Sequence, residues 1–130
     1  MRVYYFFLIS ILSISAYPVC KKKDFVFQTK TGIKKSSDIF CKYGDYYFSN
    51  NCKAGECIGK SLRKELKYNY RIKSKEVLSK FGTVEFKLCK EIGGIGQIIS
   101  VKEGSKSVKS ARCIYKNHFF EANYLNSLVR

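Results

Sequence analysis

Three residues of this chain carry side chains that could move a proton or hold a phosphate: Glu85, Arg112 and His118. A carboxylate on a strand that faces a cleft is a common general base, and a guanidinium binds phosphate or carboxylate through paired hydrogen bonds. The alternating run Val84-Glu85-Phe86 places Glu85 on the face opposite its two apolar neighbours. Considered one at a time, Glu85 and Arg112 are more simply explained as exposed surface charges.

His118 is the only histidine, and it lies in the tight corner formed by residues 116–118. A solvated surface histidine is the simpler interpretation of that position. Because neither His118 nor the cysteines show the paired spacing of a zinc site, we expect no metal and no cofactor.

The elements that would position these residues are mostly short strands. Ile58, Leu62 and Leu66 recur four residues apart and predict one helix over residues 56–68. A helix over 33–41, with 56–68 as an insertion, is the alternative. Alternating or β-branched and aromatic runs predict strands at 24–28, 38–43, 46–48, 68–72, 83–89, 97–101, 107–115 and 119–125. We therefore expect an α+β fold in which a single helix packs on an antiparallel β-sheet.

The first sixteen residues are typical of a secretory signal peptide. Arg2 supplies the positive start, residues 3–14 an apolar core, and residues 13–16 small side chains for cleavage. No later segment approaches the roughly 18 apolar residues that a membrane helix needs. We expect a secreted protein with residues 17–130 as a single domain.

All six cysteines lie after the predicted cleavage site. An even number in a small exported chain favours disulfides over free thiols. Six cysteines allow fifteen pairings, and the sequence does not choose among them. The cysteines are Cys20, Cys41, Cys52, Cys57, Cys89 and Cys113.

The order of these segments resembles the small fungal guanyl-specific ribonucleases of the N1/T1 family. The run 83–88, the Gly-rich turn at 93–96, the strand 111–117 and the run 119–122 carry the likeness. In that family an aromatic-Glu-aromatic strand holds the general base, and a later strand holds a phosphate-binding arginine. The resemblance gives these roles to Glu85 and Arg112, and implies a disulfide-stapled fold like that of the microbial ribonucleases.

The histidines of that family are missing. Its general acid would fall near Asn123-Tyr124-Leu125, and its Tyr-x-His pair is matched by Tyr68-Asn69-Tyr70. Loss of a positioned acid or base typically costs about 10²–10⁴-fold in rate. We therefore expect a catalytically inactive, ribonuclease-like protein in which Glu85 and Arg112 are vestigial.

The start of the mature chain is similar to that of the secreted effectors of powdery mildew fungi, which open with an aromatic residue followed closely by cysteine. Here the motif is Tyr17-Pro18-Val19-Cys20. The resemblance implies a monomeric virulence effector, translocated into host cells, with no small-molecule substrate. Its partners would be host RNA or ribonucleoprotein, host defence proteins, and an immune receptor.

The charge of the chain is strongly positive. The chain has 25 Lys and Arg residues and 10 Asp and Glu residues. Its net charge of +15 becomes +14 when the predicted signal peptide is removed. Proteins that bind single-stranded nucleic acid without sequence preference use basic residues interleaved with aromatic ones. The residues we assign to nucleic-acid binding are Tyr68, Tyr70, Arg71, Lys109 and Arg112.

Two other functions fit the same sequence. A cationic toxin or antimicrobial protein would use the helix at 56–68, although Leu62 and Leu66 are needed for the core. An active ribonuclease would use Glu85, Arg112 and His118. Lysine-rich composition that serves solubility alone is the competing explanation of the charge.

Overall fold

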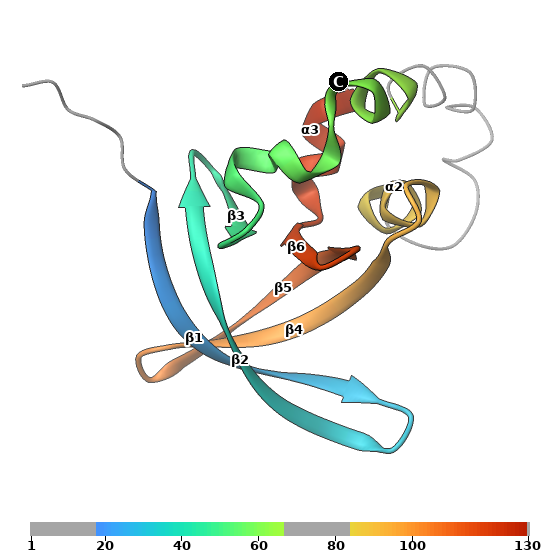
Figure 1. Ribbon diagram of the computed structural model, residues 1–130. Helices are drawn as coiled ribbons and strands as arrows, with labels where there is room; N and C mark the ends of the chain where they lie inside the picture. Colours follow the sequence, from blue (N-terminus) through green and yellow to red (C-terminus); the bar gives the residue numbers. More distant parts are fainter. Residues whose placement is uncertain (1–17, 67–83, 130) are drawn as a thin grey trace, which may run out of the picture.

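Six antiparallel strands close into a barrel in the computed structural model, which describes residues 18–66 and 84–129 (Figure 1). The order around the barrel is β1-β2-β3-β6-β5-β4. The strands are β1 (Val19–Thr29), β2 (Gly32–Tyr43), β3 (Tyr46–Ser49), β4 (Ile95–Glu103), β5 (Lys106–Tyr115) and β6 (His118–Glu121). The helices are η1 (Lys53–Ile58), α2 (Val84–Glu91) and α3 (Asn123–Val129), and residues 60–66 are also helical.

The expected fold class is therefore wrong. The molecule is not a single helix packed on an antiparallel sheet in the manner of a microbial ribonuclease, but a barrel with several short helices on one side. Alternation along a strand does not reveal whether a sheet stays open or closes on itself. Closure follows from the pairing of β1 with β4, in which Val26 lies opposite Ser100.

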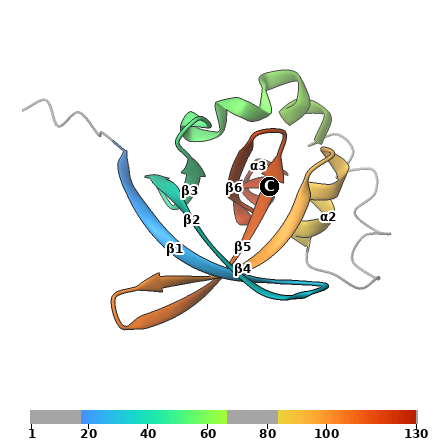
Figure 2. The same ribbon diagram turned by 60° about the horizontal axis from the view of Figure 1, so that its bottom comes forward.

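Two long hairpins build most of the barrel, β1–β2 and β4–β5 (Figures 1 and 2). The predicted strand runs 24–28, 38–43, 46–48, 97–101 and 107–115 are confirmed, and 33–41 is strand, not the alternative helix. The β4–β5 hairpin turns at Gly104, whose φ of 63° is left-handed and is readily adopted by glycine. Both hairpin tips project on the side away from most of the helices (Figures 1 and 2).

The segment around Glu85 forms a helix, not the predicted strand. Val84–Glu91 is α2, and its buried residues Leu88 and Cys89, with Ile92 directly after its end, are spaced i, i+1 and i+4, as on one helix face. The run 83–89 also alternates in polarity, so the pattern fits both the two-residue period of a strand and the 3.6-residue period of a helix. The disulfide between Cys89 and Cys113 of β5 holds this helical face against the barrel.

Two other predicted elements are changed. The helix expected at 56–68 is divided by Gly59 into η1 and the helical residues 60–66. The strand expected at 119–125 ends as β6 at Glu121, and the chain then forms α3, in which Leu125 and Val129 are buried. The strand expected at 68–72 and the predicted signal peptide lie outside the described residues.

The sheet has two apolar surfaces because alternate residues point to opposite faces. Phe25, Phe40, Ile99, Val101 and Phe119 form the cluster inside the barrel. The second cluster lies on the outer surface of β3, β5 and β6, under the helices. Its buried members are Phe48, Cys52, Ile58, Leu66, Leu88, Cys89, Ile92, Cys113, Tyr115, Phe120, Leu125 and Val129.

The prediction that the cysteines form disulfides is confirmed, and the structure gives their pairing. Cys20–Cys41 joins β1 to β2, Cys52–Cys57 closes the turn at η1, and Cys89–Cys113 joins α2 to β5. Two of the three bridges therefore lie under or within the helices.

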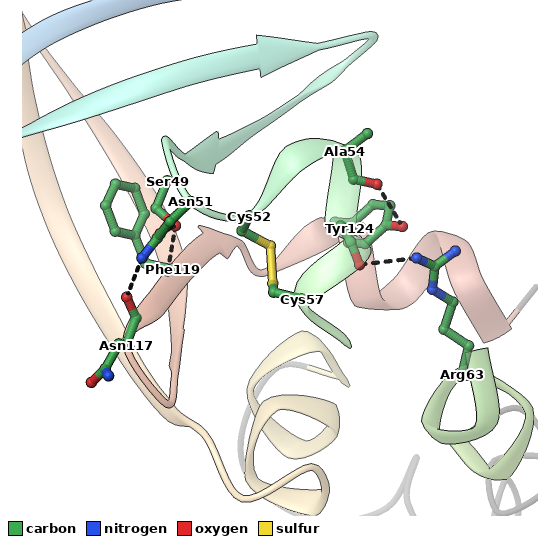
Figure 3. Close-up of a disulfide and its surroundings, with 10 residues drawn as sticks. Ser49, Asn51, Cys52, Ala54, Cys57, Arg63, Asn117, Phe119 and Tyr124 are labelled. Atoms are coloured by element: carbon green, nitrogen blue, oxygen red, sulfur yellow. Dashed lines mark hydrogen bonds between the residues drawn. A yellow bond between two sulfur atoms is a disulfide. The ribbon is translucent and has the colours of Figure 1, made fainter. Parts of the chain in front are cut away.

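The loop after β3 is fastened to two distant parts of the chain (Figure 3). Asn51 donates a hydrogen bond to the carbonyl of Asn117 at 3.0 Å, and Ser49 accepts one from the Phe119 amide at 3.1 Å. Farther along, Gly55 has a left-handed φ of 84°, and Tyr124 packs so closely on it that a Cβ would collide with the ring. The Cys52–Cys57 bridge lies between these anchor points (Figure 3).

Candidate functional site

Arg112 lies inside the barrel and is only 6% exposed. Its Nε donates to Gln97 Oε1 at 2.8 Å, and its Nη1 donates to Asp38 Oδ2 at 3.3 Å. The guanidinium carbon also lies 4.5 Å from the ring centroid of Phe25 and 5.0 Å from that of Phe119. The arginine expected as a phosphate ligand is thus occupied by the protein's own groups.

The electrostatics of Arg112 reflect this position. Burial lowers the pKa of its guanidinium, and the hydrogen bond to Asp38 partly opposes the change. Asp38 itself is 44% exposed, so the pair joins a buried cation to a carboxylate that water still reaches. Removal of the carboxylate from such a pair would leave a buried cation without its counter-charge.

Glu85 and His118 do not converge on Arg112. Glu85 lies on α2, outside the barrel. His118 precedes the inward-facing Phe119 on β6 and so points outward. The nuclease arrangement required Glu85 and Arg112 on neighbouring strands with their side chains on one concave face, and the described residues do not provide it.

One end of the barrel interior opens into a pocket of about 380 Å³. Tyr47 lies at its wall and is hydrogen-bonded to Ser110 at 2.6 Å. Burial raises the pKa of Tyr47 to about 12 and also raises the pKa of Glu121. The charged lining residues include both signs, namely Lys21, Lys23, Lys42, Asp45, Glu103 and Glu121.

A different surface presents mostly positive charge. It lies on the outside of β2, β1, β4 and β5, where the side chains of Lys35, Lys102 and Lys109 are exposed. The register places Lys35 opposite Val26 and Lys109 opposite Ser100. Val26 and Ser100 also pair with each other. Lys35, Val26, Ser100 and Lys109 therefore form one row across four strands.

A second row runs beside the first. Asp24 lies opposite Ser37, and Lys102 lies opposite Ser107. A pocket of about 430 Å³ lies among these residues and brings Lys35 and Lys102 to one hollow. We call this surface the lysine face and define it as Lys22, Asp24, Val26, Lys35, Ser37, Ser100, Lys102, Ser107 and Lys109.

The lysine face has the donors that an anion needs. Four ammonium groups and three serine hydroxyls are opposed by one carboxylate, Asp24. Lys35 and Lys109 are three strand spacings apart, or about 14 Å, so they can contact separate phosphates of one chain. No aromatic side chain stands among its residues, and the face therefore offers no platform for stacking bases.

The residues assigned to nucleic-acid binding are thus dispersed. Lys109 is on the lysine face, Arg112 is inside the barrel, and Tyr68, Tyr70 and Arg71 lie outside the described residues. Lys35 and Lys102 belong to the basic runs of the sequence but were not assigned to the site, and the serines were missed. Their alternation with inward-facing residues was a signal, but only the strand register shows that they share one surface.

No helix within residues 18–66 and 84–129 is long and apolar enough to cross a membrane. The chain matches no family model, no curated protein and no solved structure.

Proposed function

We propose that this protein is a secreted binding protein that holds RNA by its phosphate groups on the lysine face. The proposal depends most on the pair of rows that bring Lys35, Lys102 and Lys109 together with serine hydroxyls on a bare barrel surface. Lysine and serine donors to phosphate oxygens position a protein on nucleic acid without reading its sequence. Binding of this kind is dominated by the release of counterions and weakens steeply with salt.

The lack of aromatic residues on the lysine face makes the proposal specific. Stacking on aromatic rings contributes about 1–3 kcal/mol per base in proteins that hold single strands. Without it, affinity should follow phosphate density more than base identity. We expect single-stranded RNAs of equal length and different sequence to bind alike.

Secretion and a role in a host belong to the same proposal. Three disulfides support an oxidising compartment, in accord with the predicted signal peptide. The Tyr17-to-Cys20 motif supports an effector that acts on host RNA or ribonucleoprotein, with host defence proteins and an immune receptor as further partners.

The helix offered by the toxin alternative contributes to the core. Leu66 is 2% exposed, and Leu62 packs against the same apolar cluster. The apolar side of this short helix therefore faces the barrel, and the observation favours RNA binding over membrane attack. For the ribonuclease alternative, cleavage of labelled RNA that disappears in Glu85→Gln would show turnover and contradict the expectation of an inactive protein.

The test of RNA binding compares two double variants of equal charge. Lys35→Gln/Lys102→Gln removes two cations from the lysine face, and Lys60→Gln/Lys64→Gln removes two exposed cations from the helical residues 60–66. Fluorescence anisotropy with a labelled RNA of about 20 nucleotides should show about tenfold or greater weakening for the first variant and less than about threefold for the second. Equal weakening by both would mean that net charge alone binds RNA, and would overturn the proposal.

A further inference from the structure

The edge of β4 near its start is open. β4 pairs with β5 along its whole length, but it pairs with β1 only at Ile99–Val101. Within the described residues, Ile95–Ile98 therefore has no strand on its second side. The two-residue turn between Glu103 and Lys106 sets the alternation of the ladder, so that Ile98 and Gly96 direct their N–H and C=O groups toward this open side.

An apolar groove accompanies the open edge, because β1 and β4 separate beyond Phe27. The groove has a volume of about 550 Å³. The three isoleucines that line it are well exposed, with Ile33 at 73%, Ile95 at 68% and Ile98 at 59%. Contiguous apolar surface beside an unpaired strand edge is unusual on a soluble protein, because such an edge accepts another chain.

The groove continues onto α2. Phe86 packs against Gly96 so closely that a Cβ at Gly96 would collide with its ring. A second pocket of about 480 Å³ lies between Phe86 and Ile95, and it shares Gly96 and Ile98 with the first. We call these two pockets together the edge groove.

The charge of the edge groove selects its occupant. Lys109 lines one part and Lys90 the other, and no acidic residue lines either pocket in the described chain. A second copy of this strongly basic protein would bring like charges together. In the register of β4, Lys109 lies on the outer face of the sheet and Ile95 on the inner face. An incoming strand that alternates acidic with apolar side chains would therefore place its acidic groups toward the lysines and its apolar groups beside Ile95.

We propose that the edge groove binds an extended acidic peptide segment of a partner protein, which adds as a strand to Ile95–Ile98 of β4. Main-chain hydrogen bonds would supply affinity, and Ile95 would select apolar residues at alternate positions of the segment. At about 3.4 Å per residue, about four to six residues of the partner span the open edge. This site adjoins the RNA-binding surface proposed above, and Val26, Ser100 and Lys109 border both.

The probe is a short fluorescent peptide, about seven residues long, that alternates Val with Glu and is added to the oxidised protein. Ile95→Ser should weaken its binding about tenfold, as expected for the lost burial of one isoleucine. Val19→Ser is the matched control, because Val19 has a similar exposure, 59% against 68% for Ile95, and lies outside the groove. It should change binding less than about twofold.

Two further peptides test the mode of binding. Methylation of alternate backbone nitrogens should abolish binding if a strand is added, and replacement of Glu by Lys should abolish it if Lys90 and Lys109 select charge. Unchanged binding of the methylated peptide, or equal loss in Ile95→Ser and Val19→Ser, would overturn the proposal. Concentration-dependent dimerisation that Ile95→Ser removes would assign the groove to a second copy and would also overturn it.

The two proposals can fail separately. Ile95→Ser keeps every charge and should bind RNA as the unmodified protein does. Lys102→Gln lies on the lysine face and outside both pockets of the edge groove, so it should leave peptide binding unchanged. Loss of RNA binding in Ile95→Ser would show that the two surfaces are not independent and would contradict this assignment.

Discussion

The two outer sides of the barrel carry different residues on the same alternating pattern. On β5, Cys113 and Tyr115 point outward beneath the helices and are buried, whereas Lys109 points outward on the bare side and is exposed. The first side is sealed by α2, α3 and η1, and two disulfides lie there. Within residues 18–66 and 84–129, no helix covers the second side. The difference teaches that the same alternation buries apolar side chains where helices cover the barrel and leaves polar groups exposed on the bare side.

The largest predicted effect compares the disulfides of the two sides. Cys89–Cys113 and Cys20–Cys41 close loops of similar length, with sequence separations of 24 and 21, so loop entropy gives each roughly 3 kcal/mol. Both cysteines of the first pair are fully buried, whereas in the second pair Cys41 is buried and Cys20 is exposed. Replacing both cysteines by Ala should therefore cost about 1–2 kcal/mol more at Cys89–Cys113 because it leaves a larger cavity.

Urea unfolding of the two double-alanine variants measures this difference. Equal losses would show that the helix-covered side is packed no better than the bare side, contrary to the comparison.

A smaller effect is expected from the ion pair inside the barrel. Asp38→Leu leaves the buried Arg112 cation without its carboxylate and should cost about 2–3 kcal/mol, because Gln97 and two aromatic rings still contact it. Arg112→Met keeps similar volume and leaves only the partly exposed Asp38, so it should cost under about 1 kcal/mol. Chemical denaturation at neutral pH would decide, and the reverse order of the two variants would refute this account of the interior.

Tyr47 provides an effect that appears only at high pH. Its folded pKa of about 12 lies above the ordinary tyrosine value of 10.0, so the folded state retains the phenolic proton more strongly. This contribution is complete below about pH 10 and is lost as pH rises toward 12, and it amounts to roughly 2–3 kcal/mol. Tyr47→Phe should be less stable at neutral pH by about 1 kcal/mol, since Ser110 loses its partner, yet should lose less stability between about pH 10 and 12.

The measurement is thermal unfolding of the unmodified protein and of Tyr47→Phe between about pH 10 and 12. Lysine titration affects the two proteins equally and cancels in the comparison. Parallel stability curves would mean that Tyr47 ionises freely in the folded state.

The positions of several strands were accessible from the sequence. Aromatic and β-branched runs predicted them because such residues favour a pleated surface, and turns at Gly32, Gly44 and Gly104 join them into hairpins. The segment at 84–91 was not accessible in the same way. Its apolar residues fit both a strand and a helix, and the contact of Leu88 and Cys89 with the outer cluster selects the helix.

The site was harder to predict because it depends on pairing between distant residues. Arg112 was expected to be exposed, and its burial depends on Asp38, which lies 74 positions away in the chain. Lys35 and Lys109 become neighbours only through the closure of β1 on β4. Local patterns predict which face a residue takes on its strand, but barrel closure decides which residues meet.

The most direct test of RNA binding by the lysine face is the dependence of RNA affinity on salt. For a single strand, each phosphate that a lysine neutralises adds about 0.7 to the slope of log K against log salt. Lys35→Gln/Lys102→Gln should therefore lower the slope by about 1.4, while Lys60→Gln/Lys64→Gln should leave it unchanged. A flat salt dependence for the unmodified protein, or the same slope in both variants, would contradict the account.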